Sequence, residues 1–390
     1  EMYLPELIRK NDVDVVVLSY SDLSFEEVMD KASIAMANGA SFMLLGPKDT
    51  MLKSSKPVIA VTAVRTGAGK SSVSRKIVRI LKDRGVKVAI IRHPMPYAKD
   101  LDKKIVERFS SLQDALKKLR EGMLSIEELE EFEQYLVEGF EVWAGVDYEK
   151  ILRGAEETAD VILWDGGNND FPFIKPDLMI TVADALRPNH EITFYPGSIN
   201  IRMCDVVVIN KIGVAPIENW KTILDNVRRV NPRAEIILAE SRISVDDPER
   251  IRGRRVLIVE DGPTVTHGGA KFGAGYIAAK LYNPCEIVDP KQYIQENTEL
   301  YKMYEVYPHL RYVLPTIGYD RQQIKVLLDV INKVDADVVV SGTPIDLKRV
   351  FQTYNLQCEK EIVRVRYELV EVSERTLADV VSDFIEKHVG

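Results

Sequence analysis

One run of ten residues, Thr62-Ala-Val-Arg-Thr-Gly-Ala-Gly-Lys-Ser71, constrains this chain more than any other feature of its sequence. It follows an apolar run at 58–61 and leads into an amphipathic segment at 72–84. The sequence therefore predicts a strand, a glycine loop and a helix in that order. Glycines let successive backbone N–H groups converge on phosphate oxygens, and the start of the helix adds partial positive charge. This arrangement is typical of a P-loop that binds a nucleoside triphosphate.

The residue types in this run indicate individual roles. Lys70 can reach the β- and γ-phosphates, and Ser71 would hold Mg²⁺. The other positions expected to contact the nucleotide are Thr66, Gly67, Ala68, Gly69 and Ser72. Val64 stands where the first glycine of G-x-x-x-x-G-K-[ST] belongs. The alternative is a helix start that merely contains Gly-Lys-Ser, and the strand before it and the helix after it disfavour that alternative.

Length and composition limit the class of protein. A chain of 390 residues exceeds one ordinary core, and 46% hydrophobic with 29% charged residues is typical of soluble globular proteins. The net charge of −8 argues against broad binding to nucleic acid or anionic membranes. No apolar run approaches the roughly 20 residues of a membrane helix, and three scattered cysteines fit a reducing cytoplasm. We expect a cytoplasmic protein without nucleic-acid or membrane partners. Its start at Glu1-Met2 leaves a truncated N-terminus open.

Buried-strand candidates recur along the chain with helical stretches between them. They lie at 15–18, 41–45, 58–61, 86–91, 161–164, 178–182, 206–209, 236–239, 256–259 and 338–340. Continuous apolar runs are typical of strands that are covered on both faces. The repeated strand–helix–strand order predicts an α/β fold of the P-loop NTPase class, with a doubly wound, mainly parallel sheet. Ligands of such sheets bind beyond the carboxyl ends of the strands.

We expect three parts along the chain. Residues 1–55 form a partial Rossmann-like N-terminal domain, residues 56–260 the P-loop nucleotide-binding domain, and residues 261–390 a smaller α/β C-terminal region. A helical insertion is expected at about 100–158, and its charge favours a solvated helix face over a binding surface.

A polar run, Asp165-Gly-Gly-Asn-Asn-Asp170, follows the predicted strand at 160–164. An aspartate at the end of a buried strand downstream of a P-loop fits the Walker B role, so Asp165 is the candidate for the second Mg²⁺ ligand. Asn168, Asn169 and Asp170 could orient a water or an acceptor oxygen. The alternative is an ordinary turn.

Two further motifs concern the nucleotide. Arg65 lies where one subclass of P-loop ATPases carries a second lysine that acts across a dimer, so it would neutralise the transferring phosphoryl group. A surface arginine is the equal alternative, and a homodimer stays open. Asn210-Lys211 begins the N-K-x-D signature that reads guanine, but Gly213 stands at the aspartate position. Losing that acceptor removes about 1–3 kcal/mol of discrimination, so both ATP and GTP remain candidates.

A last set of side chains suits a small phosphorylated or carboxylated acceptor. Arginine forks and imidazoles near strand ends favour the recognition of oxyanions. The set is Arg92, His93, Arg187, His190, Arg202 and His267. Each residue alone is more often part of a surface ion pair or a structural loop. The glycines between 268 and 275 form either a second anion-binding loop or a close backbone contact.

Four long strings, at 161–173, 187–191, 195–202 and 259–269, resemble a prokaryotic family of P-loop proteins. Its members are predicted GTPases related to cyclic 2,3-diphosphoglycerate synthetase. The resemblance implies an enzyme that uses ATP and Mg²⁺ to close a phosphoanhydride within 2,3-diphosphoglycerate. It implies that Lys70 and Ser71 bind the triphosphate and metal, that Asp165 completes the metal site, and that the Arg/His loops hold the acceptor. Members usually have Asn-Lys-Val-Asp and a longer N-terminal domain, and this chain departs from both.

We therefore predict NTP-dependent phosphoryl transfer or phosphoanhydride formation on a small phosphorylated acid. Catalysis would come from positioning and charge neutralisation, with the catalytic candidates Lys70, Asp165, Arg65 and Asp170. One alternative is a GTPase switch or chaperone that acts on a partner protein. Another is a non-catalytic module with a degenerate P-loop, which the intact Gly69-Lys70-Ser71 disfavours.

Overall fold

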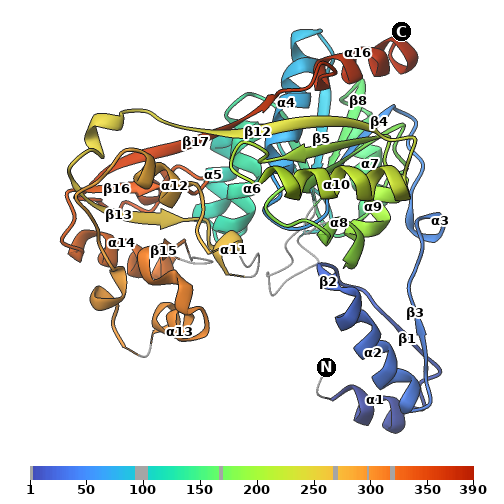
Figure 1. Ribbon diagram of the computed structural model, residues 1–390, viewed down its shortest axis with the longest axis horizontal. Coiled ribbons are helices and arrows are strands. Elements are labelled where there is room, and N and C mark those ends of the chain that lie inside the picture. The colour runs from blue at the N-terminus through green and yellow to red at the C-terminus, as the bar shows by residue number, and fades with distance from the viewer. Residues whose placement is uncertain (1–2, 93–103, 167–169, 267–270, 297, 317–320) are drawn as a thin grey trace. The chain divides into compact units, whose positions relative to one another are not determined.

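The computed structural model describes residues 3–92, 104–166, 170–266, 271–296, 298–316 and 321–390. The chain forms two compact units (Figure 1). The first unit comprises residues 1–93, 147–240 and 370–390, and the second comprises residues 94–146 and 241–369. Among the described residues, no helix combines the length and the apolar composition that crossing a membrane requires.

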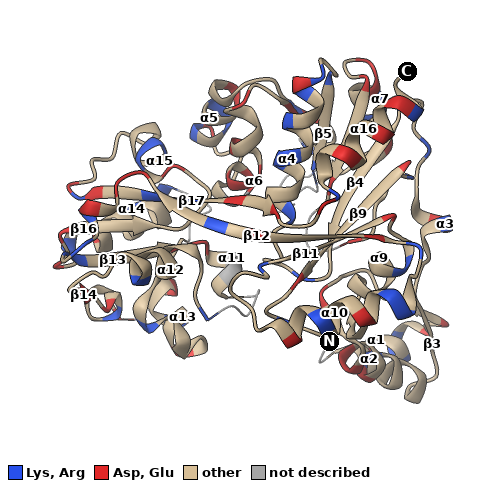
Figure 2. Ribbon diagram, turned by 45° about the horizontal axis from the view of Figure 1, so that its top comes forward, with Lys and Arg blue, Asp and Glu red and all other residues tan. Residues whose placement is uncertain are grey.

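The first unit is built on a parallel sheet. Its strands, in order across the sheet, are β12 (Glu235–Val245), β11 (Val206–Asn210), β9 (Leu178–Asp184), β4 (Val58–Ala63), β8 (Val161–Asp165) and β5 (Val88–Arg92). Every residue of the five strands from β11 to β5 is buried, as continuous apolar runs predict. Figure 2 shows β4 and β9 almost without charged residues, whereas helices at the surface carry many.

Helices cover both faces of this sheet (Figure 1). On one face α4 (Lys70–Asp83) packs against the C-terminal helix α16 (Leu377–His388), and Arg84 donates a hydrogen bond to the Ser382 hydroxyl (2.9 Å). The helices on the other face are α8 (His190–Thr193), α9 (Gly197–Met203) and α10 (Ile217–Val230). Helix α7 (Tyr148–Glu156) packs against β5 and β8.

The N-terminal segment of the first unit has a small core of its own. Its elements are α1 (Leu4–Asn11), β1 (Val15–Val17), β2 (Leu23–Ser24), α2 (Phe25–Ala37), β3 (Ser41–Met43) and α3 (Pro47–Thr50). Strands β1 and β3 pair in parallel over a core of Ile8, Ala35 and Ala40. Strand β2 pairs antiparallel with β10 (Phe194–Tyr195). This pairing brings the turn before β2 close to the P-loop of the same unit.

The second unit has a parallel sheet in the order β14 (Glu286–Ile287), β13 (Arg255–Glu260), β16 (Val338–Ser341) and β17 (Glu361–Glu371), and β15 (Leu314–Pro315) also pairs with β13. An antiparallel pair joins β6 (Glu107–Phe109) and β7 (Glu141–Ala144). The helices of this unit are α5 (Leu112–Arg120), α6 (Ile126–Leu136), α11 (Gly262–Val265), α12 (Ala274–Leu281), α13 (Glu299–Val306), α14 (Arg321–Lys333) and α15 (Leu347–Thr353).

The predicted α/β P-loop fold is confirmed, and a strand is present at each predicted position. The segment at 100–158 is not purely helical, because it also contains β6 and β7. Its helix α6 buries carboxylates such as Glu130 and Glu133 instead of exposing them. The boundaries of the compact units also differ from the predicted ones. Strand β13 pairs with β14 and β16, and α16 returns to α4, and neither partnership is visible in the local sequence.

Candidate functional site

The P-loop occupies residues 64–69, between β4 and α4. The N–H of Val64 donates to the Val182 carbonyl (2.9 Å), so Val64 continues the strand and no glycine is needed there. Gly67 and Gly69 have φ angles of +77° and +106°, which favour glycine. A Cβ on Gly69 would also lie 2.2 Å from Asn210 Nδ2. Helix α4 has no side-chain cap at its start, so its first N–H groups suit an external anion.

Asp165 lies at the centre of the candidate site. It ends β8, is fully buried, and stands in register with Val61 of β4 and Arg92 of β5. Lys70 Nζ is 2.5 Å from its Oδ1, the Ser74 hydroxyl donates to the same oxygen (2.9 Å), and Arg92 pairs with Oδ2. The sequence placed Asp165 beside the P-loop lysine, and the structure brings the two together. Arg92, predicted to hold an acceptor, shares this carboxylate.

Burial disfavours the charged form of the Lys70 side chain. Burial lowers the pKa of Lys70 to about 8, Asp165 opposes this shift, and Arg92 adds to it. The Ser72 hydroxyl is buried and has no hydrogen-bond partner among the described residues. A polyphosphate would supply both the counter-charge and the acceptor. These are the properties expected of a phosphate site.

The family of P-loop NTPases implies Mg²⁺ together with the nucleotide. The hydroxyl of Ser71 and the carboxylate of Asp165 offer the hard oxygen ligands that Mg²⁺ prefers. The described residues contain no group of three or more His, Cys, Asp or Glu side chains around one point. This donor set fits an ion that is completed by phosphate oxygens and water.

Three side chains hold successive carbonyls of the P-loop. Arg187 donates to the Thr66 carbonyl (2.7 Å), Lys211 Nζ to that of Gly67 (2.6 Å), and Asn210 Nδ2 to that of Ala68 (3.0 Å). Because the C=O and N–H of a trans peptide point in opposite directions, these bonds leave the loop N–H groups directed away from the donors. We call Asp184, Arg187, Asn210 and Lys211 the P-loop clamp.

Asp184 links two members of the P-loop clamp, Arg187 and Lys211, and was not among the residues predicted from the sequence. Its Oδ2 accepts from Arg187 Nε (3.0 Å) and lies 2.8 Å from Lys211 Nζ. Burial would raise the pKa of Asp184, but Lys211 and Arg187 outweigh burial and lower it. The available signal was its place at the end of a predicted buried strand, and only the structure shows that it stands in register with Asn210. The structure thus sets Arg187, predicted for the acceptor, and both Asn210 and Lys211, predicted for the nucleotide, against the loop backbone.

Arg65 is held by three neighbours on its own unit. It forms an ion pair with Asp22, its Nη1 is 3.0 Å from His190 Nδ1, and its guanidinium lies 3.9 Å from the Phe194 ring centroid. Burial, with Arg65 and Arg187, lowers the pKa of His190 to about 4, so its imidazole is neutral at pH 7. His190 therefore does not offer the positive charge expected of an acceptor ligand. No motif in the sequence pointed to Asp22.

Asp170 and Arg202 are the remaining described residues of the predicted set, and the Asp170 carboxylate opposes the lowering of the Lys70 pKa. The carbonyl of Asp170 accepts from Asn200 Nδ2 (3.4 Å), and its carboxylate adds to burial in raising the pKa of Tyr148. Arg202 donates to the Ser198 carbonyl (2.8 Å) within α9. The other predicted residues lie outside the described residues: His93, Asn168, Asn169 and His267.

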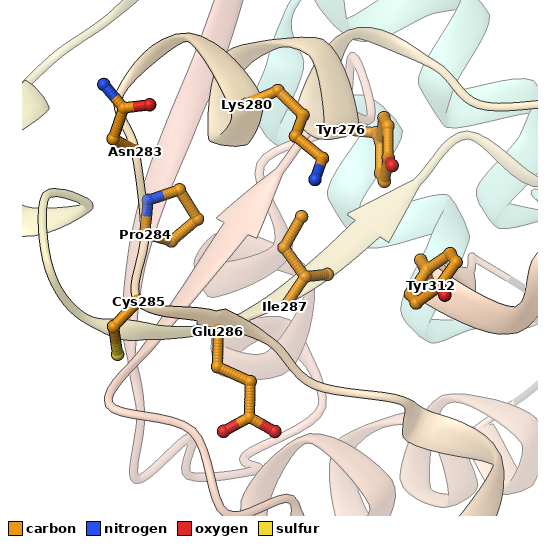
Figure 3. Close-up of a pocket in the computed structure, with 8 residues that line it drawn as sticks. All are labelled: Tyr276, Lys280, Asn283, Pro284, Cys285, Glu286, Ile287 and Tyr312. Atoms are coloured by element: carbon orange, nitrogen blue, oxygen red, sulfur yellow. The ribbon is translucent and has the colours of Figure 1, made fainter.

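A pocket of about 360 Å³ lies in the second unit (Figure 3). Tyr276 and Lys280 line it from α12, together with Glu286 of β14 and Tyr312. None of the residues that the sequence assigned to nucleotide or acceptor lines this pocket. The candidate site therefore rests on the P-loop and Asp165.

Comparisons with known proteins identify a nucleotide-binding domain in the part of the chain that contains the P-loop. The model of the CobW/HypB/UreG nucleotide-binding domain matches residues 57–238. Arginine synthetase ArcE of Thermococcus kodakarensis is 52% identical over 381 residues, which are 98% of this chain and 82% of that protein. Cyclic 2,3-diphosphoglycerate synthetase of Thermococcus onnurineus is 25% identical over 257 residues, 60% of this chain and 58% of that protein. LpxK of Aquifex aeolicus, solved with ATP, aligns with a TM-score of 0.47 and 12% identity over 92% of this chain and 95% of that one.

The relation to cyclic 2,3-diphosphoglycerate synthetase, predicted from the sequence, is thus present but weak, while the likeness to ArcE extends along nearly the whole chain. Both relatives are named synthetases, and the P-loop domain binds nucleotide. The chain belongs to the family of arginine synthetase ArcE, and it is a nucleotide-dependent synthetase with a CobW/HypB/UreG-type nucleotide-binding domain.

Proposed function

We propose that this enzyme forms arginine from citrulline, ammonia and a nucleoside triphosphate. The observation that carries the proposal is the 52% identity to arginine synthetase ArcE over 98% of the chain. The intact P-loop and the pair of Lys70 with Asp165 support it, because they suit a reaction driven by a triphosphate.

The chemistry follows from the product. Citrulline carries a ureido oxygen where arginine carries a nitrogen, and that oxygen is a poor leaving group. Transfer of the γ-phosphoryl group to the ureido oxygen would make it part of a phosphate ester, and the P–O bond to the diphosphate breaks. Ammonia then attacks the carbon, the C–O bond breaks, and phosphate leaves. The products are arginine, the nucleoside diphosphate and inorganic phosphate.

The residues of the site divide into a donor side and an acceptor side. Lys70 and the α4 N-terminus would bind the β- and γ-phosphates, and Ser71 and Asp165 would hold Mg²⁺, which neutralises phosphate charge when bound. Arg92 lies on the Asp165 oxygen that Lys70 does not contact, and it is 1% exposed. We assign Arg92 and Asp170 to the acceptor side.

A phosphorylated acid is the second candidate acceptor. It is supported by the 25% identity to cyclic 2,3-diphosphoglycerate synthetase. Arg92 would then face a phosphate of the acceptor instead of the ureido group, since a guanidinium binds phosphate well.

The test is a product assay with each acceptor. The protein is incubated with Mg²⁺ and ATP or GTP, and with citrulline plus ammonia, with 2,3-diphosphoglycerate, or with no acceptor. We expect arginine and the nucleoside diphosphate in equal amounts, with little hydrolysis of the nucleoside triphosphate when citrulline is omitted. Release of the nucleoside diphosphate that depends on added 2,3-diphosphoglycerate would favour a phosphorylated acid as the acceptor. Equal hydrolysis in all arms would contradict both and favour a nucleotide switch.

A further inference from the structure

Gly213 occupies the position at which the N-K-x-D signature carries its aspartate. Its φ angle is not positive, so the backbone does not demand glycine there. Space is limited instead, because a Cβ on Gly213 would lie 2.9 Å from Oε1 and 3.0 Å from Cδ of Glu240. A carboxylate from another strand therefore lies where a side chain at position 213 would begin.

The backbone fixes Glu240 in this place. Strands β11 and β12 pair in parallel as far as Ile209 and Leu238. Beyond the strand end, the N–H of Ile212 donates to the Ala239 carbonyl (3.2 Å), which continues the contact into the loop. Glu240 follows directly, so its side chain starts beside the loop that carries Gly213.

Two residues at the start of the loop that carries Gly213 connect it to the P-loop. Asn210 and Lys211 donate to the carbonyls of Ala68 and Gly67, as part of the P-loop clamp. The loop at 211–215 therefore begins at the nucleotide site. We propose that Glu240 supplies the carboxylate that position 213 lacks and accepts hydrogen bonds from the N–H edge of the nucleotide's purine base. This inference rests on nucleotide binding and not on the identity of the acceptor.

The chemistry of the purine edge explains why a carboxylate discriminates. Guanine presents N1–H and a 2-amino group, while adenine presents a 6-amino group next to an unprotonated N1. A carboxylate accepts but cannot donate, so it binds the amino groups and repels ring acceptors. Losing such a bond, or leaving a partner unsatisfied, changes affinity by about tenfold or more.

Binding measurements without any acceptor test the proposal. The affinities of ATP, GTP and tripolyphosphate are compared between the wild type and Glu240→Ala. We expect the wild type to distinguish the two purines by about tenfold or more, and Glu240→Ala to bring their ratio close to one. Tripolyphosphate has no base, so its affinity should not change. The matched control Glu218→Ala, on the exposed start of α10, should keep the wild-type ratio.

Two further variants identify which purine Glu240 contacts and control for misfolding. Glu240→Gln keeps the size of the side chain. If Glu240 binds guanine, this variant should lower the affinity for GTP, because the amide N–H would face the N–H donors of guanine. If Glu240 binds adenine, the affinity for ATP should be retained. The exchange variant Gly213→Asp with Glu240→Ala moves the carboxylate to the aspartate position of N-K-x-D and should give a preference for guanine, whichever purine the wild type prefers. The proposal is overturned if wild type shows no purine preference, if Glu240→Ala leaves the ratio unchanged, or if tripolyphosphate affinity falls in parallel. None of these outcomes depends on whether arginine is the product.

Discussion

The start of α4 in the first unit and the start of α12 in the second both lie downstream of a buried strand and both contain glycines, but their N–H groups suit different partners. At α12 the carboxylate of Glu260 accepts from the N–H groups of Gly273 (3.1 Å), Gly275 (3.3 Å) and Tyr276 (2.7 Å). At α4 no side chain caps the helix, and the neighbouring carboxylate, Asp165, faces Lys70 instead. The α12 start binds a carboxyl group of its own chain, and the α4 start suits an external anion.

The glycines have different purposes at the two sites. A Cβ on Gly273 or Gly342 would lie 2.4 Å from a carboxylate oxygen of Glu260, so these glycines make room for the chain's own side chain. Gly67 and Gly69 instead permit left-handed backbone in the P-loop. Of the second anion-binding loop considered from the sequence, Gly273 and Gly275 are described, and their N–H groups bind Glu260. A glycine-rich helix start is therefore informative only together with the charged side chains that lie beside it.

Lys70→Ala tests most directly whether the start of α4 binds an external anion. Removing the cation that faces the β- and γ-phosphates should lower triphosphate affinity by about 1,000-fold. Calorimetry at constant ionic strength measures this change. Lys82→Ala, in the last turn of the same helix, is the matched control and should bind like the wild type. Full affinity in Lys70→Ala would mean that the polyphosphate does not bind at the start of α4.

The buried Glu260 carboxyl group at the start of α12 predicts that stability depends on pH. Burial raises the pKa of Glu260 from 4.5 to about 7, although the three N–H groups oppose the shift. The folded state thus binds the proton more tightly than the unfolded state. The stabilisation from this group is complete below about pH 4.5 and is lost as pH rises through 7, a change of about 3 kcal/mol.

Hydrogen exchange of the α12 amides at pH 5 and pH 8, corrected for intrinsic rates, measures this effect. We expect α12 to open more easily at pH 8. Glu260→Gln fixes the neutral form and should remove most of the difference. Asp184 should behave in the opposite way, because its lowered pKa makes its contribution disappear as pH falls through the acid range. Equal pH profiles for α12 and for the P-loop clamp would contradict the comparison.

The sequence predicted what depends on short patterns. The P-loop, Lys70 and Asp165 follow from strand-end motifs, and parallel strands bring their carboxyl ends to one edge. It could not predict Asp22, Asp184 or the place of Glu240, because each acts through a side chain that only the tertiary register brings near. For the same reason it could not foresee that Arg187 and Lys211 contact loop carbonyls, or that α16 packs on α4.

Arg187→Lys tests how the P-loop keeps its shape without an anion of its own. The guanidinium of Arg187 contacts Asp184 through Nε and Nη2 and also donates to the Thr66 carbonyl. Lysine keeps the charge but cannot make these contacts in one plane. We expect triphosphate affinity to fall by about 3- to 10-fold, the equivalent of one hydrogen bond, while Arg229→Lys on α10 changes nothing.

A companion variant, Arg187→Met, separates geometry from charge. If the clamp acts by directing the Thr66 carbonyl, Lys and Met should weaken the triphosphate to a similar degree, because both lose the planar contact. If the charge beside Asp184 is what matters, only Met should weaken it, since lysine still compensates the buried carboxylate. The first result would mean that the P-loop depends on side chains for the shape that Glu260 gives to α12 by direct contact. The second would reduce the clamp to an electrostatic partner of Asp184.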